Sequence, residues 1–171
     1  MEKKLNVLVI ASLLAAITTI ATIVIRIPIF ATNGYINIGD AIVLLSAWFL
    51  GNPYGALAAG IGSGLADLLA GYPAYIPGTT VIKFLMAFIW AVIFKMLTKK
   101  GLSDAASSVI SSVIAEIWMI LGYLLYESFL LGYGKAALAS VAGNATQAVA
   151  GLVLGSALMA LLKKIKNLLT Y

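Results

Sequence analysis

Four ionisable residues lie within long apolar stretches of the sequence, where a charge is expensive and usually serves a function: Asp40, Asp67, Lys83 and Glu116. Asp67 and Lys83 lie at similar distances from the facing ends of two neighbouring apolar stretches. At about 1.5 Å per helical residue, both are at roughly 6–8 Å depth. Opposite charges at one depth on antiparallel helices can meet, so we expect this pair to lie close together. The contact would be either a plain ion pair or part of a ligand site.

A deeper polar layer is predicted from Glu116, Asn144 and Gln147. Glu116 is 11 residues from Glu127, at the outer end of its stretch, which corresponds to roughly 16 Å of helix. Asn144 and Gln147 are spaced i, i+3 on one helical face, at roughly 12–17 Å. With the Lys83 ammonium, these groups could line a polar pocket closed to lipid. The alternative is a hydrogen-bond network that only fastens the helices; we favour the pocket because an unpaired glutamate is a costly fastener.

Two tyrosines are expected to contribute to the same pocket. Tyr35 and Tyr75 lie in connections predicted to overhang it, and their rings suit stacking on a flat heterocycle. Most other tyrosines fit an aromatic belt at the membrane interface. Asp40 begins a short apolar stretch, where a carboxylate that caps a helix is the favoured interpretation.

The sequence contains neither cysteine nor histidine. A disulfide, a thiolate nucleophile, a Ser-His-Asp triad and a histidine zinc site are therefore excluded. The Walker pattern GxxxxGK[ST] does not occur either, so the chain does not hydrolyse ATP by that route. We expect no metal, no cofactor and no catalysis, because an intramembrane enzyme would have only Asp, Glu, Lys and Ser to use.

These residues must be positioned by membrane helices. Hydrophobic residues make up 63% of the 171 positions and charged residues 10%, with a mean hydropathy of +1.07, whereas a soluble domain carries about a quarter charged residues. At about 20 residues per span, no room remains for a soluble domain. Pro28 should end the first span, and a loop with an Asn33-Gly34 turn should follow. We predict an all-α fold, one domain over 1–171, with six spans at 5–27, 40–50, 54–70, 79–97, 105–127 and 136–162.

The basic residues predict the orientation of this bundle. Six spans place both termini on one side, together with eight of the eleven basic residues. The positive-inside rule makes that side cytoplasmic, so we expect a multi-pass protein of the cell membrane. The net charge of +5 is then explained by topology, and no nucleic-acid partner is expected. The eight residues are Lys3, Lys4, Lys95, Lys99, Lys100, Lys163, Lys164 and Lys166.

Small residues recur at four-residue intervals on several spans. In lipid, such residues let two helices approach closely. Internal packing explains the glycines of the third and sixth spans. On the first span, Ala11 and Ala15 form a pair that could instead meet a partner protein.

Four segments make the sequence similar to a known family: Gly34–Asp40, Leu50–Ala56, Ala66–Tyr72 and Pro77–Lys83. With the six-span layout, they resemble the S component of an energy-coupling factor (ECF) transporter, most closely the branch assigned to hydroxymethylpyrimidine and pyridoxine. The resemblance implies a small membrane protein that captures a vitamin from outside, in its outer half, among the fourth, fifth and sixth helices. It also implies docking on a transmembrane coupling subunit that carries two ATP-binding subunits. Ala11 and Ala15 resemble the family's docking motif.

Residues and resemblance together predict a substrate-capture subunit for a small aromatic nitrogen heterocycle. Asp67, Lys83 and Glu116 sum to one negative charge when all are ionised, so a protonatable ligand nitrogen would match Glu116. This favours an aminopyrimidine or pyridoxine over an acid such as pantothenate. The alternatives are an S component for another vitamin, such as pantothenate or riboflavin, and a stand-alone homo-oligomeric channel or facilitator. The predicted ligand site comprises Tyr35, Asp67, Tyr75, Lys83, Glu116, Asn144 and Gln147.

Overall fold

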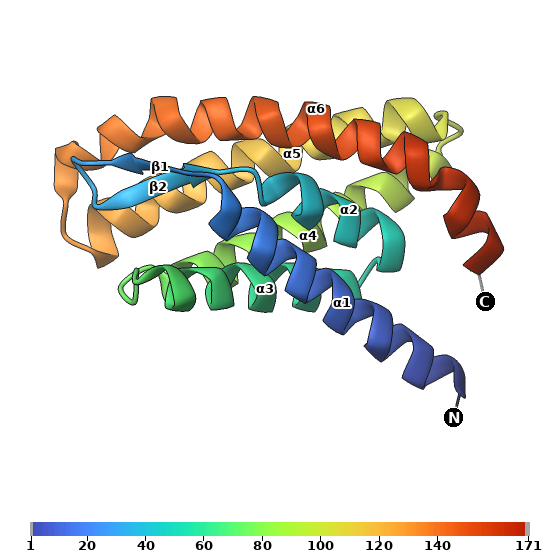
Figure 1. Cartoon of the computed structure of the whole chain (residues 1–171). Helices are drawn as coiled ribbons and strands as arrows, with labels where there is room; N and C mark the ends of the chain where they lie inside the picture. The colour runs from blue at the N-terminus through green and yellow to red at the C-terminus, as the bar shows by residue number, and fades with distance from the viewer. Residues whose placement is uncertain (1, 170–171) are drawn as a thin grey trace.

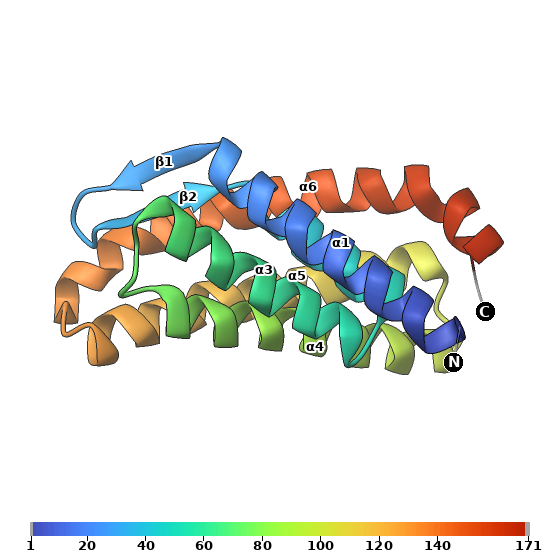
Figure 2. The same cartoon turned by 60° about the horizontal axis from the view of Figure 1, so that its bottom comes forward.

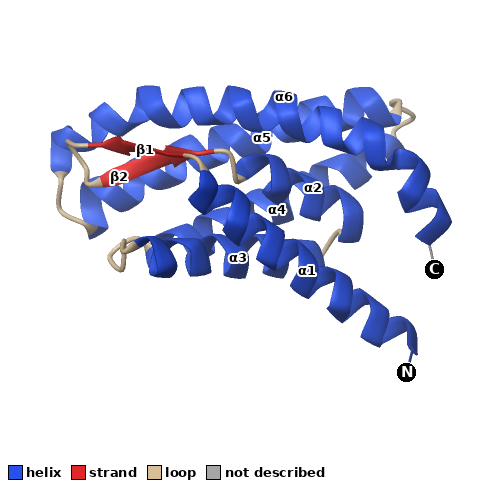
Figure 3. Ribbon diagram, in the orientation of Figure 1, coloured by secondary structure: helices blue, strands red, loops and turns tan. Residues whose placement is uncertain are grey.

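The computed structural model describes residues 2–169, with the side chains of residues 4–163. This part of the chain forms six α-helices and one two-stranded hairpin (Figures 1 and 3). A short π-helical turn and a 3-10 turn connect the last two helices. In chain order the elements are α1 (Glu2–Val24), β1 (Arg26–Ile29), β2 (Gly34–Asn37), α2 (Asp40–Leu50), α3 (Tyr54–Ala70), α4 (Ile76–Lys99), α5 (Asp104–Leu125), η1 (Tyr126–Leu130), η2 (Gly134–Ala137) and α6 (Leu138–Leu169).

The helices fall into two length classes. Four of the described helical segments are long and apolar enough to cross a membrane: Lys4–Val24, Ile76–Lys99, Asp104–Leu130 and Gly134–Lys163. The remaining two, α2 and α3, have 11 and 17 residues, which corresponds to about 16 and 25 Å against a hydrocarbon core of about 30 Å. Their bounds agree with the predicted segments, but α2 covers only about half of the bilayer.

The described part of the chain is mostly helical, as predicted, but a hairpin begins where the first span was predicted to continue to residue 27. The first helix ends at Val24, and Arg26–Ile29 pairs antiparallel with Gly34–Asn37, with Arg26 opposite Asn37 and Ile29 opposite Gly34. Proline lacks the N–H that a helix interior needs, but it is tolerated on an edge strand, and Pro28 lies on one. The predicted turn is present, with Asn33 in the left-handed region at φ 50°.

The helices run along the length of the molecule, so connections gather at its two ends (Figures 1 and 2). The hairpin tip, the α3–α4 connection and the α5–α6 connection lie at one end, which we call the hairpin end. The start of α1, the end of α6, the α2–α3 connection and the α4–α5 connection lie at the opposite end, which we call the terminal end. Basic residues at the terminal end include Lys99, the last residue of α4, and Lys100, which follows it. The side chains of Lys3, Lys164 and Lys166 lie outside the described part.

Glycines allow the close contacts of this bundle. A Cβ at Gly64 would lie 2.1 Å from the Thr80 hydroxyl of α4, and one at Gly62 would lie 2.5 Å from the Ala15 carbonyl of α1. Helix α3 therefore packs against α4 on one face and α1 on the other. Helix α2 lies in the core, where Val43 and Leu44 are fully buried.

Candidate functional site

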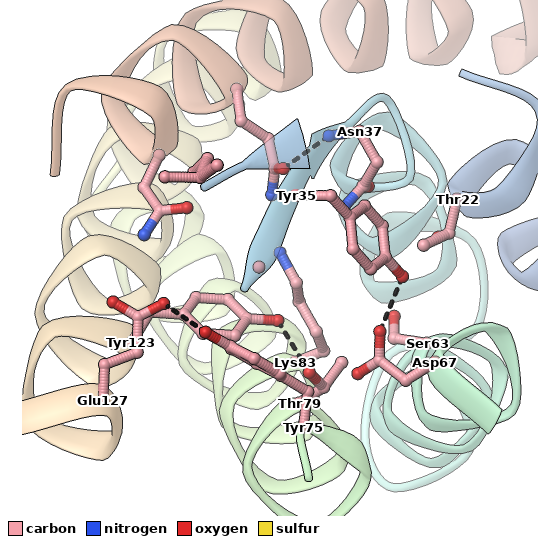
Figure 4. A pocket seen from close by; sticks show the side chains of 14 residues that line it. Thr22, Tyr35, Asn37, Ser63, Asp67, Tyr75, Thr79, Lys83, Tyr123 and Glu127 are labelled. Carbon is pink, nitrogen blue, oxygen red and sulfur yellow. Dashed lines mark hydrogen bonds between the residues drawn. The ribbon is translucent and has the colours of Figure 1, made fainter. Parts of the chain in front are cut away.

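A polar cavity lies between the hairpin and the helices near the hairpin end (Figure 4). Its volume is about 20 Å³, which is room for little more than one water molecule. The wall is unusually polar for a site inside an apolar bundle. It is formed by Thr22, Ile29, Gly34, Tyr35, Asn37, Ser63, Asp67, Tyr75, Thr79, Lys83, Tyr123, Glu127, Asn144 and Gln147.

The Lys83 ammonium points into this cavity (Figure 4). It forms an ion pair with Asp40, not with Asp67 as the sequence suggested. Lys83 and Asp40 are 2% and 0% exposed. Asp40 makes no capping bond, because Gly39 occupies the N-cap of α2, so the capping interpretation was wrong. Helix rise gives the depth of a side chain but not the direction in which it points.

Asp67 is bound to the hairpin instead. Its Oδ1 accepts a 2.6 Å hydrogen bond from the Tyr35 hydroxyl, whereas its Oδ2 has no hydrogen-bond partner among the described residues. Burial raises the pKa of the Tyr35 hydroxyl above its usual value, and the neighbouring Asp67 charge adds to this. Tyr35 therefore stays a proton donor at neutral pH, and Asp67 keeps one oxygen available within the cavity wall.

Tyr75 links three connections at the hairpin end. Its hydroxyl lies 2.7 Å from the Thr32 carbonyl and 3.0 Å from the Glu127 carboxyl group. Burial is the main cause that raises the pKa of this hydroxyl. Glu127 also accepts a hydrogen bond from Ser140. The Tyr72 ring, 4.7 Å from Tyr35 and 6.5 Å from Tyr75 between centroids, completes a row of aromatic rings beside the cavity.

The two amides predicted on α6 both line the cavity but differ in what they bind. Gln147 accepts from the Asn37 backbone N–H and donates to Asp40, each at 2.8 Å. It thereby connects the hairpin to the Lys83–Asp40 ion pair. No hydrogen bond joins the Asn144 side chain to any other described residue. Its amide therefore keeps its capacity to bind a ligand.

Glu116 lies outside the cavity lining, although its helical depth suggested otherwise. It is 3% exposed, and neither carboxyl oxygen has a hydrogen-bond partner among the described residues. Its closest approaches include Gly151, where an added Cβ would lie 2.4 Å from Oε1. Asp40, Lys83 and Gln147 form a bonded group that joins α2, α4 and α6, and Glu116 has no hydrogen bond to this group.

Sequence reasoning missed eight of the fourteen wall residues, among them Tyr123, Thr79 and Glu127. Tyr123 was assigned to the interfacial belt, but its hydroxyl donates to Thr79 at 3.0 Å and its ring lies 5.4 Å from the Lys83 nitrogen. Thr79 is one helical turn before Lys83, a spacing that could have identified it. In the sequence analysis, Glu127 was used only to mark the outer end of the helix that contains Glu116. No sequence signal distinguished it from an exposed terminal charge.

Ala11 and Ala15, which were predicted to meet a partner protein, lie partly against the rest of the bundle. The Ala15 carbonyl and Cα lie 2.5 and 3.0 Å from the position of a Cβ on Gly62, and the next turn is tied to α3 by a Thr19–Gly62 hydrogen bond of 2.8 Å. Both alanines are half-buried, whereas Ser12 and Ala16 are exposed. Ser12 and Ala16 therefore form the more accessible pair of small residues.

Comparisons with known proteins cover nearly the whole chain. Residues 2–164 match the family described as "ECF-type riboflavin transporter, S component". A protein of Pyrococcus woesei, described as "Uncharacterized protein in gap 3'region", is 36% identical over 146 residues, which are 85% of this chain and 94% of that protein. The membrane-length helices, the polar cavity at one end and this match agree: the chain belongs to the ECF-type riboflavin transporter S-component family.

Proposed function

We propose that the chain captures a small aromatic nitrogen heterocycle, hydroxymethylpyrimidine or pyridoxine, in the cavity at its hairpin end. The observation that supports this most is the unused hydrogen-bonding capacity of the wall. Asp67 Oδ2 and the Asn144 amide have no partner among the described residues, and both border the same small space. A ring nitrogen or a hydroxymethyl group supplies the complementary donors and acceptors.

The aromatic row beside the cavity supports a flat ligand. The Tyr72 ring centroid lies 4.7 Å from that of Tyr35 and 6.5 Å from that of Tyr75, and an aromatic ligand gains from offset stacking against such rings. The 20 Å³ cavity must widen for any vitamin. A single ring requires a smaller displacement of Tyr35 and Tyr75 than a fused tricyclic ring does.

Riboflavin is the second candidate, because the matching family is named for it. Its isoalloxazine ring would also use the tyrosines, but it needs more of the hairpin to move. The proposed ligand therefore remains a single-ring vitamin, and the binding experiment below compares both.

The proposed setting is the cell membrane, with the terminal end cytoplasmic and the hairpin end outside. Lys99 and Lys100 at the terminal end agree with the positive-inside rule. Delivery would require docking on a transmembrane coupling subunit with two ATP-binding subunits. We propose that α1 provides the docking face, through the exposed Ser12 and Ala16 beside Ala11 and Ala15.

Calorimetric titration of the purified chain with hydroxymethylpyrimidine, pyridoxine and riboflavin tests this proposal. A single-ring vitamin should bind, and Asp67→Asn should weaken its binding at least about tenfold, or about 1.4 kcal/mol. Asp104→Asn is the matched control, because Asp104 lies at the terminal end with its side chain 65% exposed, and it should leave the affinity unchanged.

Binding of riboflavin alone would reject the proposed substrate. An equal affinity of wild type and Asp67→Asn would remove Asp67 from the site. Solute flux into liposomes that contain only this chain would favour the channel alternative over a subunit that needs ATP-binding partners.

A further inference from the structure

Two opposite charges border the ligand cavity without contacting each other. The Lys83 ammonium and the Asp67 carboxyl group both belong to its wall (Figure 4). They lie within electrostatic reach of one another, but no ion pair joins them in the described part of the chain. Both residues are buried, at 2% and 3% exposed. The cavity is therefore bordered by a cation and an acid that a bound molecule can connect.

Lys83 keeps a hydrogen-bond donor for the cavity. An ammonium has three N–H groups, and among the described residues Asp40 is its one hydrogen-bond acceptor. The Lys83 nitrogen also lies 5.4 Å from the centre of the Tyr123 ring. If that ring takes a second N–H, the third remains for the ligand. A buried donor without an acceptor is costly, so the ligand should place an acceptor atom here.

Asp67 makes the opposite demand. Its Oδ1 accepts from the Tyr35 hydroxyl, while its Oδ2 has no partner among the described residues. The Lys83 charge is already compensated by Asp40, so the Asp67 charge is not. A positively charged N–H of the ligand satisfies Oδ2 best, because charge-assisted hydrogen bonds are roughly twice as strong as neutral ones.

The other acid of the cavity wall, Glu127, makes no such demand. Its two carboxyl oxygens are already bonded, one to the Tyr75 hydroxyl and one to the Ser140 hydroxyl. The polar groups that await a ligand are therefore the Lys83 ammonium, Asp67 Oδ2 and the Asn144 amide. Two of these three carry opposite charges, which requires opposite charges on the ligand.

We propose that the cavity holds its ligand as a zwitterion, an aromatic ring whose protonated nitrogen donates to Asp67 Oδ2 and whose anionic oxygen accepts from Lys83. A 3-hydroxypyridine takes this form when its proton moves from oxygen to nitrogen, so that the O–H bond breaks and a ring N–H bond forms. Pyridoxine is a 3-hydroxypyridine, whereas hydroxymethylpyrimidine is not. The inference rests on the proposed function and selects pyridoxine-type vitamins within it.

The absorption spectrum of the bound vitamin reports this form directly. A 3-hydroxypyridine absorbs at longer wavelength as the zwitterion than as the neutral tautomer, and apolar surroundings normally favour the neutral tautomer. Pyridoxine bound at saturation to the purified chain should keep the zwitterion band. Asp67→Asn should shift bound pyridoxine toward the neutral tautomer, because the positive N–H loses its charged partner. Asp104→Asn, with its side chain 65% exposed at the terminal end, should leave the spectrum unchanged.

Calorimetry with pyridoxine analogues needs the wild type only, so it decides the matter even if Asp67→Asn does not fold. An analogue with hydrogen in place of the ring hydroxyl cannot form the zwitterion and should bind at least about tenfold more weakly. An analogue without the ring methyl keeps both charges and should lose only about fourfold, the contribution of one buried methyl group. Hydroxymethylpyrimidine should bind at least about tenfold more weakly than pyridoxine.

The outcomes separate this inference from the proposed function. Pyridoxine bound as the neutral tautomer, or equal affinity for pyridoxine and its analogue without the hydroxyl, overturns the zwitterion and leaves a single-ring vitamin site. Binding of hydroxymethylpyrimidine but not of pyridoxine does the same. Failure of every single-ring vitamin to bind removes the proposed function and this inference together.

Discussion

The Lys83 ammonium has three carboxylates within electrostatic reach, Asp40, Asp67 and Glu116, and is bonded to the first. Its position over the Tyr123 ring adds a cation–π contact at 5.4 Å. With both members of the pair at most 2% exposed, neither can be left alone without an uncompensated buried charge. The Lys83–Asp40 pair therefore fixes the position of the Lys83 side chain in the cavity wall.

Lys83→Met should lower the free energy of unfolding by about 3–5 kcal/mol, because it leaves Asp40 buried without its cation. Asp40→Asn added to this variant should recover part of the loss, since the uncompensated charge disappears. Denaturant titration in detergent measures both. Strictly additive losses in the double variant would contradict a direct interaction.

The sequence predicted which polar residues turn inward better than it predicted their partners. Six of the seven predicted site residues line the cavity, and Glu116 is the exception. A polar side chain within an apolar span avoids lipid, so its presence predicts that it faces the interior of the bundle. Depth along a helix does not give the direction of a side chain, so Lys83 was paired with Asp67 instead of Asp40. Whether these residues bind a vitamin stays a prediction.

At the scale of elements, the hairpin supplies one wall of the cavity and rests on α6. A Cβ at Gly143 would lie 2.9 Å from Ile29 Cδ1 and 3.0 Å from Ile36 Cδ1. The sequence did not reveal this hairpin, because Ile25 and Ile27 continue the apolar run of the first helix on both sides of Arg26. Only the alternation around Ile27 and Ile29, with Pro28 between them, distinguishes a strand from a helix end.

Gly143→Leu should displace the hairpin from α6 and speed hydrogen exchange of the β2 amides at least about tenfold, because the new side chain occupies the space of Ile29 and Ile36. Ala142→Leu is the control, since Ala142 is exposed on the same helix and should leave exchange unchanged. Hydrogen–deuterium exchange with mass spectrometry measures both. Equal exchange in the two variants would show that the hairpin does not depend on this contact.

At the scale of the whole molecule, the first helix leaves the bundle toward the terminal end (Figure 1). Leu5, Leu8 and Val9 are 51–61% exposed there, while Thr18 and Thr22 near the other end are buried. The same helix thus packs inside the bundle at one end and offers an apolar face at the other. In the proposed transporter, that face is the one available to the coupling subunit.

Ala16→Trp and Ala15→Trp should separate docking from packing. Ala16→Trp adds bulk on the exposed face and should block assembly with the coupling subunits while the free energy of unfolding changes little. Ala15→Trp should destabilise the chain itself, because Ala15 lies against Gly62. Pull-down of the coupling subunits, with unfolding of each variant as the control, checks this. Normal assembly of Ala16→Trp would exclude this face from docking.

The open edge of β1 fixes how deeply the protein can sit in a bilayer. Among the described residues, β1 pairs with β2 alone, so the backbone groups of its other edge need water or lipid headgroups. Arg26, at the start of β1, donates a 3.4 Å hydrogen bond to the carbonyl of Ala70 at the end of α3. From Lys4 to Val24, α1 has 21 residues, or about 31 Å, which matches the hydrocarbon thickness. The hydrocarbon boundary therefore passes near Val24 and Ala70, and the hairpin that covers the cavity lies in the headgroup layer.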